Sequence, residues 1–178
     1  MTNAVIPLMT DEEAPKEVRE FFEKVGETIG FVPNLFRLWA RAPHLLDPLI
    51  AFETAVSGSG KISMHLKGLA MLRTSELNGC PYCAAVHGAK FESIGGATEQ
   101  AAALKQRQLP QGLFSEEELT VLQLTDEMTL MVRGQPETVG KAIALFGVDG
   151  AVELMAVIAL LNFDNRMAFT AELPVDMR

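Results

Sequence analysis

Residues 75–87 read Ser-Glu-Leu-Asn-Gly-Cys-Pro-Tyr-Cys-Ala-Ala-Val-His, and they contain both cysteines of the chain. Asn78 and Gly79 interrupt the helical pattern of apolar residues that starts after Ser63, because a glycine readily ends a helix. Pro81 suits the first turn of a new helix. The sequence therefore predicts two helices with a sharp break between them. Both sulfurs would lie in the first turn of the second helix.

That position favours chemistry at sulfur. The free N–H groups and the positive end of the helix dipole both stabilise a thiolate. The two-residue spacer lets the sulfurs of Cys80 and Cys83 approach bonding distance. His87 follows Cys83 by four residues, on the same helical face, where an imidazole can take the thiol proton. The pattern indicates a redox pair with Cys83 as nucleophile, His87 as base and Cys80 as partner thiol.

Two other interpretations fit the same residues. Cys80, Cys83 and His87 could be three ligands of a structural zinc ion, with His65 as the fourth. Alternatively, the cysteines are simply small buried residues and the histidine lies at the surface. Redox chemistry is favoured, because a second cysteine pair is missing and so apolar a chain needs no metal to fold. We expect neither a metal nor a bound cofactor.

Outward from this segment, almost every stretch shows helical spacing of its apolar residues, and none alternates as a strand does. We expect an all-α fold of about eight helices without a sheet. One domain would span residues 1–178, with an N-terminal helical extension at about 1–60, a redox core at about 61–100 and C-terminal helices at about 101–178. The expected helices lie at about 14–29, 35–39, 45–52, 63–77, 80–94, after a cap at Thr98, after a capping box of Ser115 and Glu118, at 136–147 and at 150–171.

Composition excludes several classes of protein. The 178 residues are 48% hydrophobic, which excludes intrinsic disorder. The 15 basic against 23 acidic residues give a net charge of -8, which argues against nucleic acid and anionic membranes as partners. The N-terminus lacks the basic and apolar regions of a signal peptide, and the apolar run at 151–161 is too short to cross a bilayer. We expect a cytoplasmic protein.

Other candidate residues carry weaker signals. His44 is expected at the surface, whereas His65 could face the cysteines from the preceding helix. Phe31, Phe36 and Trp39 form an aromatic stripe that is more typical of a core than of a substrate wall. The last helix has more apolar surface than one chain can cover, which predicts a homo-oligomer.

Residues 72–87 resemble the signature of the AhpD-like branch of the carboxymuconolactone decarboxylase family. The segment Gly30-Phe-Val-Pro-Asn-Leu-Phe36, the Ala42-Pro43 element and Gly60-Lys-Ile-Ser63 are similar to its longer, peroxidase-related members. The resemblance extends over residues 10 to 100, roughly, and continues in the C-terminal third as a helical pattern.

This resemblance implies an AhpD-like helical bundle that assembles as a trimer or hexamer. It also implies a thiol-dependent hydroperoxide reductase, in which Cys83 is activated by His87 and forms a disulfide with Cys80. An external dithiol, carried by a dihydrolipoyl or thioredoxin-type protein, would then reduce the disulfide. The alternatives are a cofactor-free enzyme of the lactone decarboxylase type and a non-enzymatic redox sensor.

The chain departs from the family pattern before the first cysteine. Lys67 and Gly68 stand where relatives often have an Arg-Glu pair, whose glutamate starts the proton relay. Tyr82 stands where some peroxidases have a histidine. Glu76, four residues before Cys80, is the expected substitute for the glutamate. Its carboxylate would reach His87 across the turn, and otherwise Gly68→Glu should restore the relay.

Overall fold

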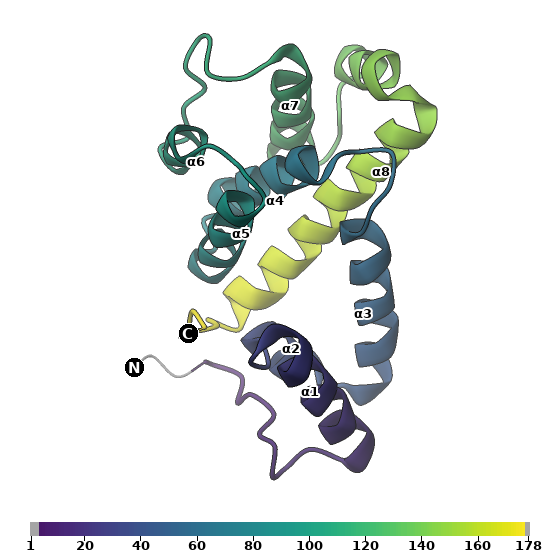
Figure 1. Ribbon diagram of the computed structural model, residues 1–178, viewed down its shortest axis with the longest axis vertical. Helices are drawn as coiled ribbons and strands as arrows, with labels where there is room; N and C mark the ends of the chain where they lie inside the picture. Colours follow the sequence, from purple (N-terminus) through teal and green to yellow (C-terminus); the bar gives the residue numbers. More distant parts are fainter. Residues whose placement is uncertain (1–3, 177–178) are drawn as a thin grey trace.

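The computed structural model describes residues 4–176, and these residues form helices and loops without a strand (Figure 1). This confirms the predicted all-α class. The helices are α1 (Lys16–Ile29), α2 (Asn34–Trp39), α3 (Pro43–Ser57), α4 (Met64–Asn78), α5 (Pro81–Ser93), α6 (Thr98–Lys105), α7 (Glu116–Leu130) and α8 (Pro136–Thr170).

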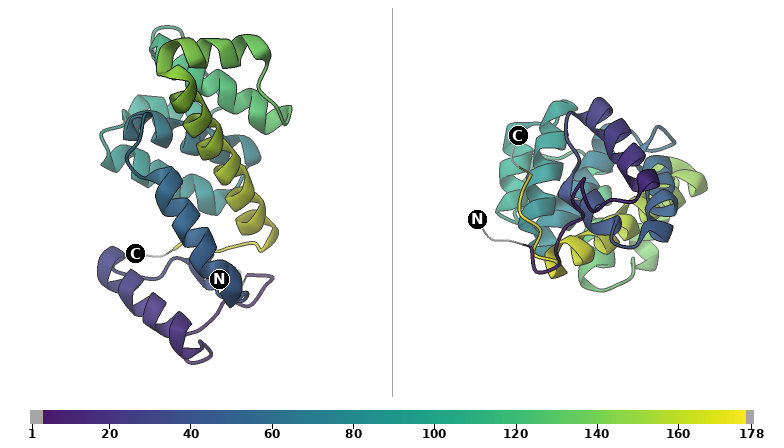
Figure 2. Two further views of the ribbon diagram at one scale, coloured as in Figure 1. Left: turned by 90° about the vertical axis from the view of Figure 1, so that its right-hand side faces the viewer. Right: turned by 90° about the horizontal axis from the view of Figure 1, so that it is seen from below.

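The long helix α8 is the axis of the molecule. It packs against α3, α4, α5 and α7, and it crosses from the upper helices to the α1–α2 region (Figures 1 and 2). The buried side chains of Leu154, Ile158 and Leu161 join the main hydrophobic core. Gly147 interrupts the helix with φ 72° and ψ 170°. This break confirms the expected division of the segment at Gly147.

By length and hydropathy alone, α8 would be long and apolar enough to cross a membrane. The apolar run at 151–161, which Glu153 interrupts, is by itself too short for that. The central core helix of a globular protein can meet the same criteria of length and hydropathy. Here α8 carries core residues along its length, which is the arrangement of such a helix.

Two helix starts differ from the sequence prediction. Pro43 begins α3, which runs on to Ser57 and is therefore longer than the expected 45–52. Thr98 is the first residue of α6 and not its cap, since Ala97 holds the cap position without a side-chain hydrogen bond. The capping box of Ser115 and Glu118 at the start of α7 is confirmed.

A buried lysine joins three of these helices. The Lys67 ammonium on α4 donates hydrogen bonds to the carbonyl oxygens of Val56 and Gly58, at 2.7 and 2.6 Å, at the end of α3. It also forms an ion pair with Glu153 on α8 at 2.5 Å. The exposed fraction of Lys67 is only 1%. This clamp fixes the end of α3 against α4 and α8.

One face of α8 is left uncovered. Val148, Val152, Met155 and Phe163 recur at helical spacing and are all exposed, Val152 by 60%. Their spacing of three, four or eight residues places them on one side of the helix. The described part of the chain therefore presents an apolar stripe to its surroundings, called the α8 stripe below.

Candidate active site

The junction of α4 and α5 is a compact turn that the sequence dictates. Gly79 adopts φ 65°, a left-handed conformation that favours glycine, and its N–H donates to the Glu76 carbonyl. The Cys80 N–H donates to the Ser75 carbonyl at 3.2 Å. These two bonds form a Schellman motif. Cys80 therefore ends one helix and caps the next, as the sequence predicted.

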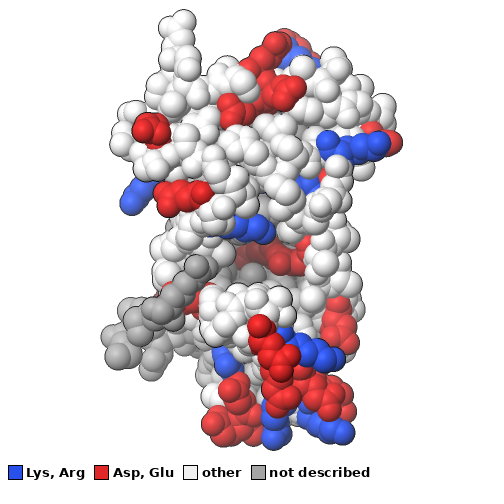
Figure 3. Space-filling model, viewed as in Figure 1, with Lys and Arg blue, Asp and Glu red and all other residues white. Residues whose placement is uncertain are grey.

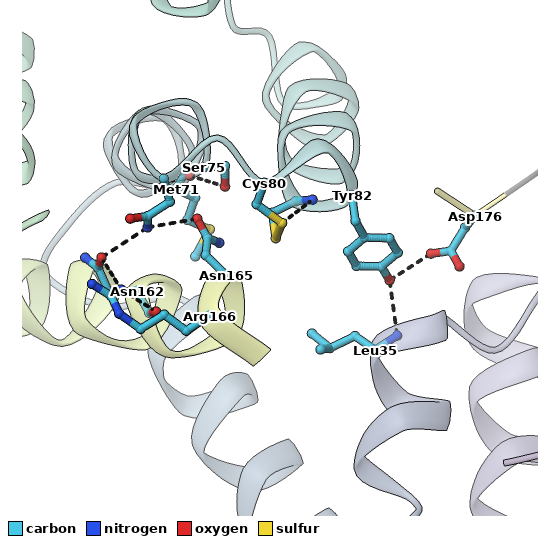
Figure 4. Close-up of a disulfide and its surroundings, with 11 residues drawn as sticks. Leu35, Met71, Ser75, Cys80, Tyr82, Asn162, Asn165, Arg166 and Asp176 are labelled. Carbon is cyan, nitrogen blue, oxygen red and sulfur yellow. Dashed lines mark hydrogen bonds between the residues drawn. A yellow bond between two sulfur atoms is a disulfide. The ribbon is translucent and has the colours of Figure 1, made fainter. Parts of the chain in front are cut away.

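The two cysteines are joined by a disulfide with 5.3 Å between their Cα atoms. The Sγ atom of Cys80 accepts a hydrogen bond from the Cys83 N–H at 3.2 Å (Figure 4). Pro81 occupies the first turn of α5. The predicted approach of the sulfurs at a helix start is thus present in the structure.

Side chains from distant segments hold this turn in place. The Arg107 guanidinium donates to the carbonyl oxygens of Glu76 and Leu77 at the end of α4. The Asn78 amide donates to the side chains of Asn162 and Asn165 on α8, both at 3.1 Å (Figure 4). These contacts fix the position of the cysteines relative to α8.

A cavity of about 590 Å³ lies against the disulfide, and Cys83 lines it. Cys80 is not among its lining residues and packs in one apolar cluster with Cys83, Leu38 and Ala168. In Figure 3 the surface is hollowed between the upper helices and the α1–α2 region, with acidic side chains inside the hollow. The apolar lining includes Ile29, Phe31, Pro33, Leu35, Phe36, Val86, Leu161 and Val175. The polar lining includes Glu53, Ser57, Tyr82, His87, Lys90, Ser93, Asp164 and Asp176.

The aromatic stripe is only partly a core feature. Trp39 is buried and stacks on Phe36, with 5.6 Å between the ring centroids. Phe31 and Phe36, however, line the cavity. Phe36, on α2, also packs against the N-terminal core cluster that contains Trp39, so it belongs to the core and to the cavity wall, whereas Phe31 lines the cavity from the loop before α2.

Tyr82 forms hydrogen bonds that join α2 and the C-terminal segment to the site. Its hydroxyl donates to Asp176 at 2.9 Å and accepts from the Leu35 N–H at 3.3 Å (Figure 4). Burial, followed by the nearby Asp176 carboxylate, raises the pKa of Tyr82 well above its usual value. The phenol therefore stays protonated and acts as a fixed part of the cavity wall.

His87 lies in the same cavity as Cys83, as the helical spacing predicted. Its Nδ1 atom is buried without a hydrogen-bond partner. Burial, and then the positive charge of Lys90, lower the pKa of His87 to about 4. The imidazole is therefore neutral at neutral pH and can accept a proton.

The expected contact between Glu76 and His87 is absent from the described part of the chain. Glu76 does not line the cavity, and its recorded hydrogen bonds involve its backbone carbonyl. A Cβ atom added at Gly68 would lie 2.8 Å from Ile94 Cδ1 and 3.3 Å from Phe91 Cδ2. Gly68→Glu stays a prediction, and the substitution would require the end of the Ile94 side chain to move.

The remaining histidines lie away from the cysteines. His44 is exposed, as expected. His65 pairs with Glu118 at 2.6 Å and packs against Phe91, and it does not line the cavity. Within residues 4–176, no three His, Cys, Asp or Glu side chains are arranged to hold a metal ion. The zinc alternative therefore gains no support from the arrangement of these side chains.

Two acidic residues that the sequence analysis did not single out face the cavity. Asp164 on α8 is hydrogen-bonded to Glu53 on α3, and both line the cavity with Cys83 and His87. The exposed fraction of Asp164 is only 3%. Burial, and then the charge of Glu53, raise its pKa to about 9. No local sequence pattern marks either residue as part of a site.

The match to a known family covers the centre of the chain. Residues 43–127 match the carboxymuconolactone decarboxylase family, a span that runs from α3 into α7 and includes both cysteines and His87. The chain has no significant match among curated proteins.

Solved structures with the same fold cover almost the whole chain. An uncharacterized peroxidase-related protein from Silicibacter sp. TM1040 superposes with a TM-score of 0.82 at 21% identity, over 99% of this chain and 95% of that chain. A peroxidase-related protein with an alkylhydroperoxidase AhpD core, from Ralstonia eutropha JMP134, gives 0.85 at 20% identity, over 99% and 94%. These likenesses confirm the predicted AhpD-like fold.

The debrominase Bmp8 has the same fold as well. Its apo structure gives a TM-score of 0.80 at 18% identity, over 98% of this chain and 93% of that chain. A cysteine-to-alanine variant of Bmp8 is known in complex with 2,3,4-tribromopyrrole. At such low identity this likeness is one of fold alone.

Proposed function

We propose, from the membership of this chain in the carboxymuconolactone decarboxylase family and its AhpD-like fold, that it is a thiol-dependent reductase of organic hydroperoxides. The observation that carries the proposal is that Cys83, one member of a closely spaced cysteine pair, lines a largely apolar cavity. A neutral histidine lines the same cavity. Such a cavity suits an organic hydroperoxide with an apolar substituent.

The first half of the reaction takes place at Cys83. In the reduced protein, His87 accepts the proton of the Cys83 thiol, and the thiolate attacks the terminal oxygen of the hydroperoxide. The S–O bond forms as the O–O bond breaks. Sulfur is oxidised to a sulfenic acid, and the departing alkoxide takes up a proton to give the alcohol.

Cys80 completes the reaction. Its sulfur attacks the Cys83 sulfenic acid, so that the S–S bond forms and the S–O bond breaks. The Cys80 proton and the departing hydroxide leave as water. One hydroperoxide is thereby reduced to an alcohol and water by two thiols. An external dithiol, carried by a dihydrolipoyl or thioredoxin-type protein in the cytoplasm, returns the disulfide to the two thiols.

The test is single-turnover oxidation of the pre-reduced protein by tert-butyl hydroperoxide. We expect loss of two thiols and appearance of one tert-butanol per chain, with no reaction in Cys83→Ser. His87→Ala should slow the loss of thiols about tenfold or more, since general base catalysis commonly contributes about 10²–10⁴-fold. Intact thiols after exposure to excess hydroperoxide would contradict the proposal.

The same variants separate the alternative functions. A cofactor-free reaction of the lactone decarboxylase type would survive replacement of both cysteines by serine. A redox sensor would form its disulfide slowly and change its assembly on oxidation. The role of Glu76 stays a prediction, and an unchanged oxidation rate in Glu76→Gln would remove it from the relay.

A further inference from the structure

The reaction proposed above needs a group that gives a proton to the departing alkoxide. An alkoxide is a poor leaving group at neutral pH, so a positioned acid accelerates cleavage of the O–O bond. His87 is neutral in the resting site and gains a proton only from the Cys83 thiol, so a second group that already holds a proton would supply an acid independent of that transfer. The family position for a relay carboxylate holds Gly68, whose surroundings are filled by Phe91 and Ile94.

The cavity contains one carboxyl pair that meets this need. Asp164 comes from α8 and Glu53 from α3, and the pair lines the same cavity as the α5 residues Cys83 and His87. The two carboxyl groups share a hydrogen bond, which requires a proton on one of them. A buried aspartic acid beside a second carboxyl keeps such a proton, because burial and the neighbouring charge both disfavour its ionised form.

A second observation points into the cavity. The Oδ1 atom of Asp164 is buried and has no hydrogen-bond partner, although the residue lines the cavity. Buried polar atoms are normally paired, so an unpaired oxygen beside an apolar cavity has capacity to bind a polar ligand atom. A hydroperoxide oxygen would supply that contact.

We propose that the Glu53–Asp164 pair is the general acid of the site. The pair transfers its shared proton to the alkoxide that departs as the terminal oxygen of the hydroperoxide becomes bonded to Cys83. This inference rests on the proposed function and assigns a residue role within it. When the O–O bond breaks, the departing alkoxide takes the proton of the pair and becomes an alcohol. The pair then carries one additional negative charge. A proton from solvent restores the pair before the next turnover.

The protonation of the pair fits this role. The pKa of Asp164 is raised to about 9 by burial and by Glu53, so the proton is present at neutral pH. The other titratable groups lining the cavity are Tyr82, His87 and Lys90 from α5 and Asp176 from the C-terminal segment, besides Cys83 itself. Of these, Tyr82 keeps its proton throughout this pH range, and His87 has already lost its own.

The experiment compares two reactions of the reduced Cys83 thiol. Oxidation by tert-butyl hydroperoxide needs a proton for its leaving group, whereas alkylation by iodoacetamide releases iodide and needs none. The ratio of the two rates cancels the fraction of thiolate. We expect this ratio to fall about tenfold or more in Asp164→Asn at pH 7, with the alkylation rate unchanged. Asp149→Asn, an exposed residue of the same helix, is the matched control.

A pH series provides a second readout that a purely structural role would not change. In the wild-type protein the ratio should fall as pH rises through about 9, because the acid is lost. In Glu53→Gln this fall should move to lower pH, since removal of the neighbouring charge lets Asp164 ionise more easily. Asp164→Asn should show no such fall.

The outcomes separate this inference from the function on which it rests. A wild-type protein whose thiols hydroperoxide does not oxidise would overturn the proposed function and the inference together. If the ratio of the oxidation rate to the alkylation rate is the same in the wild-type protein and in Asp164→Asn, the acid role alone would be overturned. Equal losses of alkylation and oxidation in Asp164→Asn would also overturn it, because they would show a general disturbance of Cys83.

Discussion

Burial keeps both Asp164 and His87 uncharged at neutral pH, although one is an acid and the other a base. The pKa of Asp164 is raised to about 9 and that of His87 is lowered to about 4. The two shifts have the same cause, which is the loss of solvent around the charged form. A proton donor and a proton acceptor are therefore available in one cavity under the same conditions.

The raised pKa of Asp164 predicts how stability depends on pH. The folded chain keeps a proton on Asp164 up to about pH 9, whereas the unfolded chain loses it near pH 4, roughly. The stabilising contribution is therefore complete below about pH 4 and is lost as pH rises toward 9. His87 has the opposite sign, but only between its folded value of about 4 and its usual 6.5.

We therefore expect urea unfolding between pH 7 and 8.5 to show a steeper loss of stability in the wild-type protein than in Asp164→Asn. The difference in slope should approach about 1.4 kcal/mol per pH unit, the value for one proton. Glu172→Gln, on the C-terminal side of α8, should keep the wild-type slope. Parallel curves for wild type and Asp164→Asn would show that Asp164 titrates normally.

At this scale the sequence predicted the residues that share a helix and missed those that do not. Cys80, Cys83 and His87 follow one another within two turns, so spacing alone relates their side chains. Glu53 and Asp164 are more than one hundred positions apart, and only the packing of α3 against α8 brings them together. Without an alignment or coordinates, neither carries a local pattern that marks it as a site residue.

Among the helices, the connection between α3 and α4 determines where Glu53 lies. Lys67 is shielded from water, binds the carbonyl oxygens of Val56 and Gly58 at the end of α3, and pairs with the partly buried Glu153 of α8. Removing one partner of such a buried pair leaves charges and carbonyls without compensation. The clamp therefore connects the stability of the fold to the geometry of the cavity.

Lys67→Met, which keeps the apolar stem and removes the charge, should lower the free energy of unfolding by about 3–5 kcal/mol. Lys141→Met is the matched control, because Lys141 pairs with Glu137 on the exposed surface of α8. That surface pair should make no measurable difference. Equilibrium urea unfolding followed by circular dichroism would measure both, and equal stabilities of the two variants would contradict the clamp.

The helices themselves were largely predictable, since caps and glycines mark their ends. Gly79, Gly147 and the capping box at Ser115 each indicated a boundary that the structure has. The length of α3 was not predictable in the same way. Pro48 lies inside it, and a proline in that position normally argues for a break.

At the scale of the whole molecule, the chain has two apolar surfaces, which are the cavity beside Cys83 and the exposed α8 stripe. The cavity is lined by five segments of the same chain, whereas the stripe of Val148, Val152, Met155 and Phe163 is exposed at the surface. A second copy of the chain would remove this apolar area from water. The predicted homo-oligomer, a trimer or hexamer, thus has a candidate contact surface.

Val152→Glu should shift the protein toward the monomer in sedimentation velocity at micromolar concentration, because it puts a charge in the centre of the stripe. Leu109→Glu is the control, since Leu109 is also exposed but lies in the loop after α6. A wild-type protein that sediments as a 19.4 kDa monomer would contradict the prediction. Unchanged assembly of Val152→Glu would place the contact elsewhere.

The central claim is that Cys83, the sulfur that faces the cavity, attacks the hydroperoxide and that Cys80 resolves the product. The most direct measurement is mass spectrometry of reduced Cys80→Ser and Cys83→Ser proteins after one equivalent of tert-butyl hydroperoxide in the presence of dimedone, which traps sulfenic acids. We predict a dimedone adduct on Cys83 in Cys80→Ser and none in Cys83→Ser. An adduct on Cys80 in Cys83→Ser, with Cys83 unmodified in the other variant, would contradict the account.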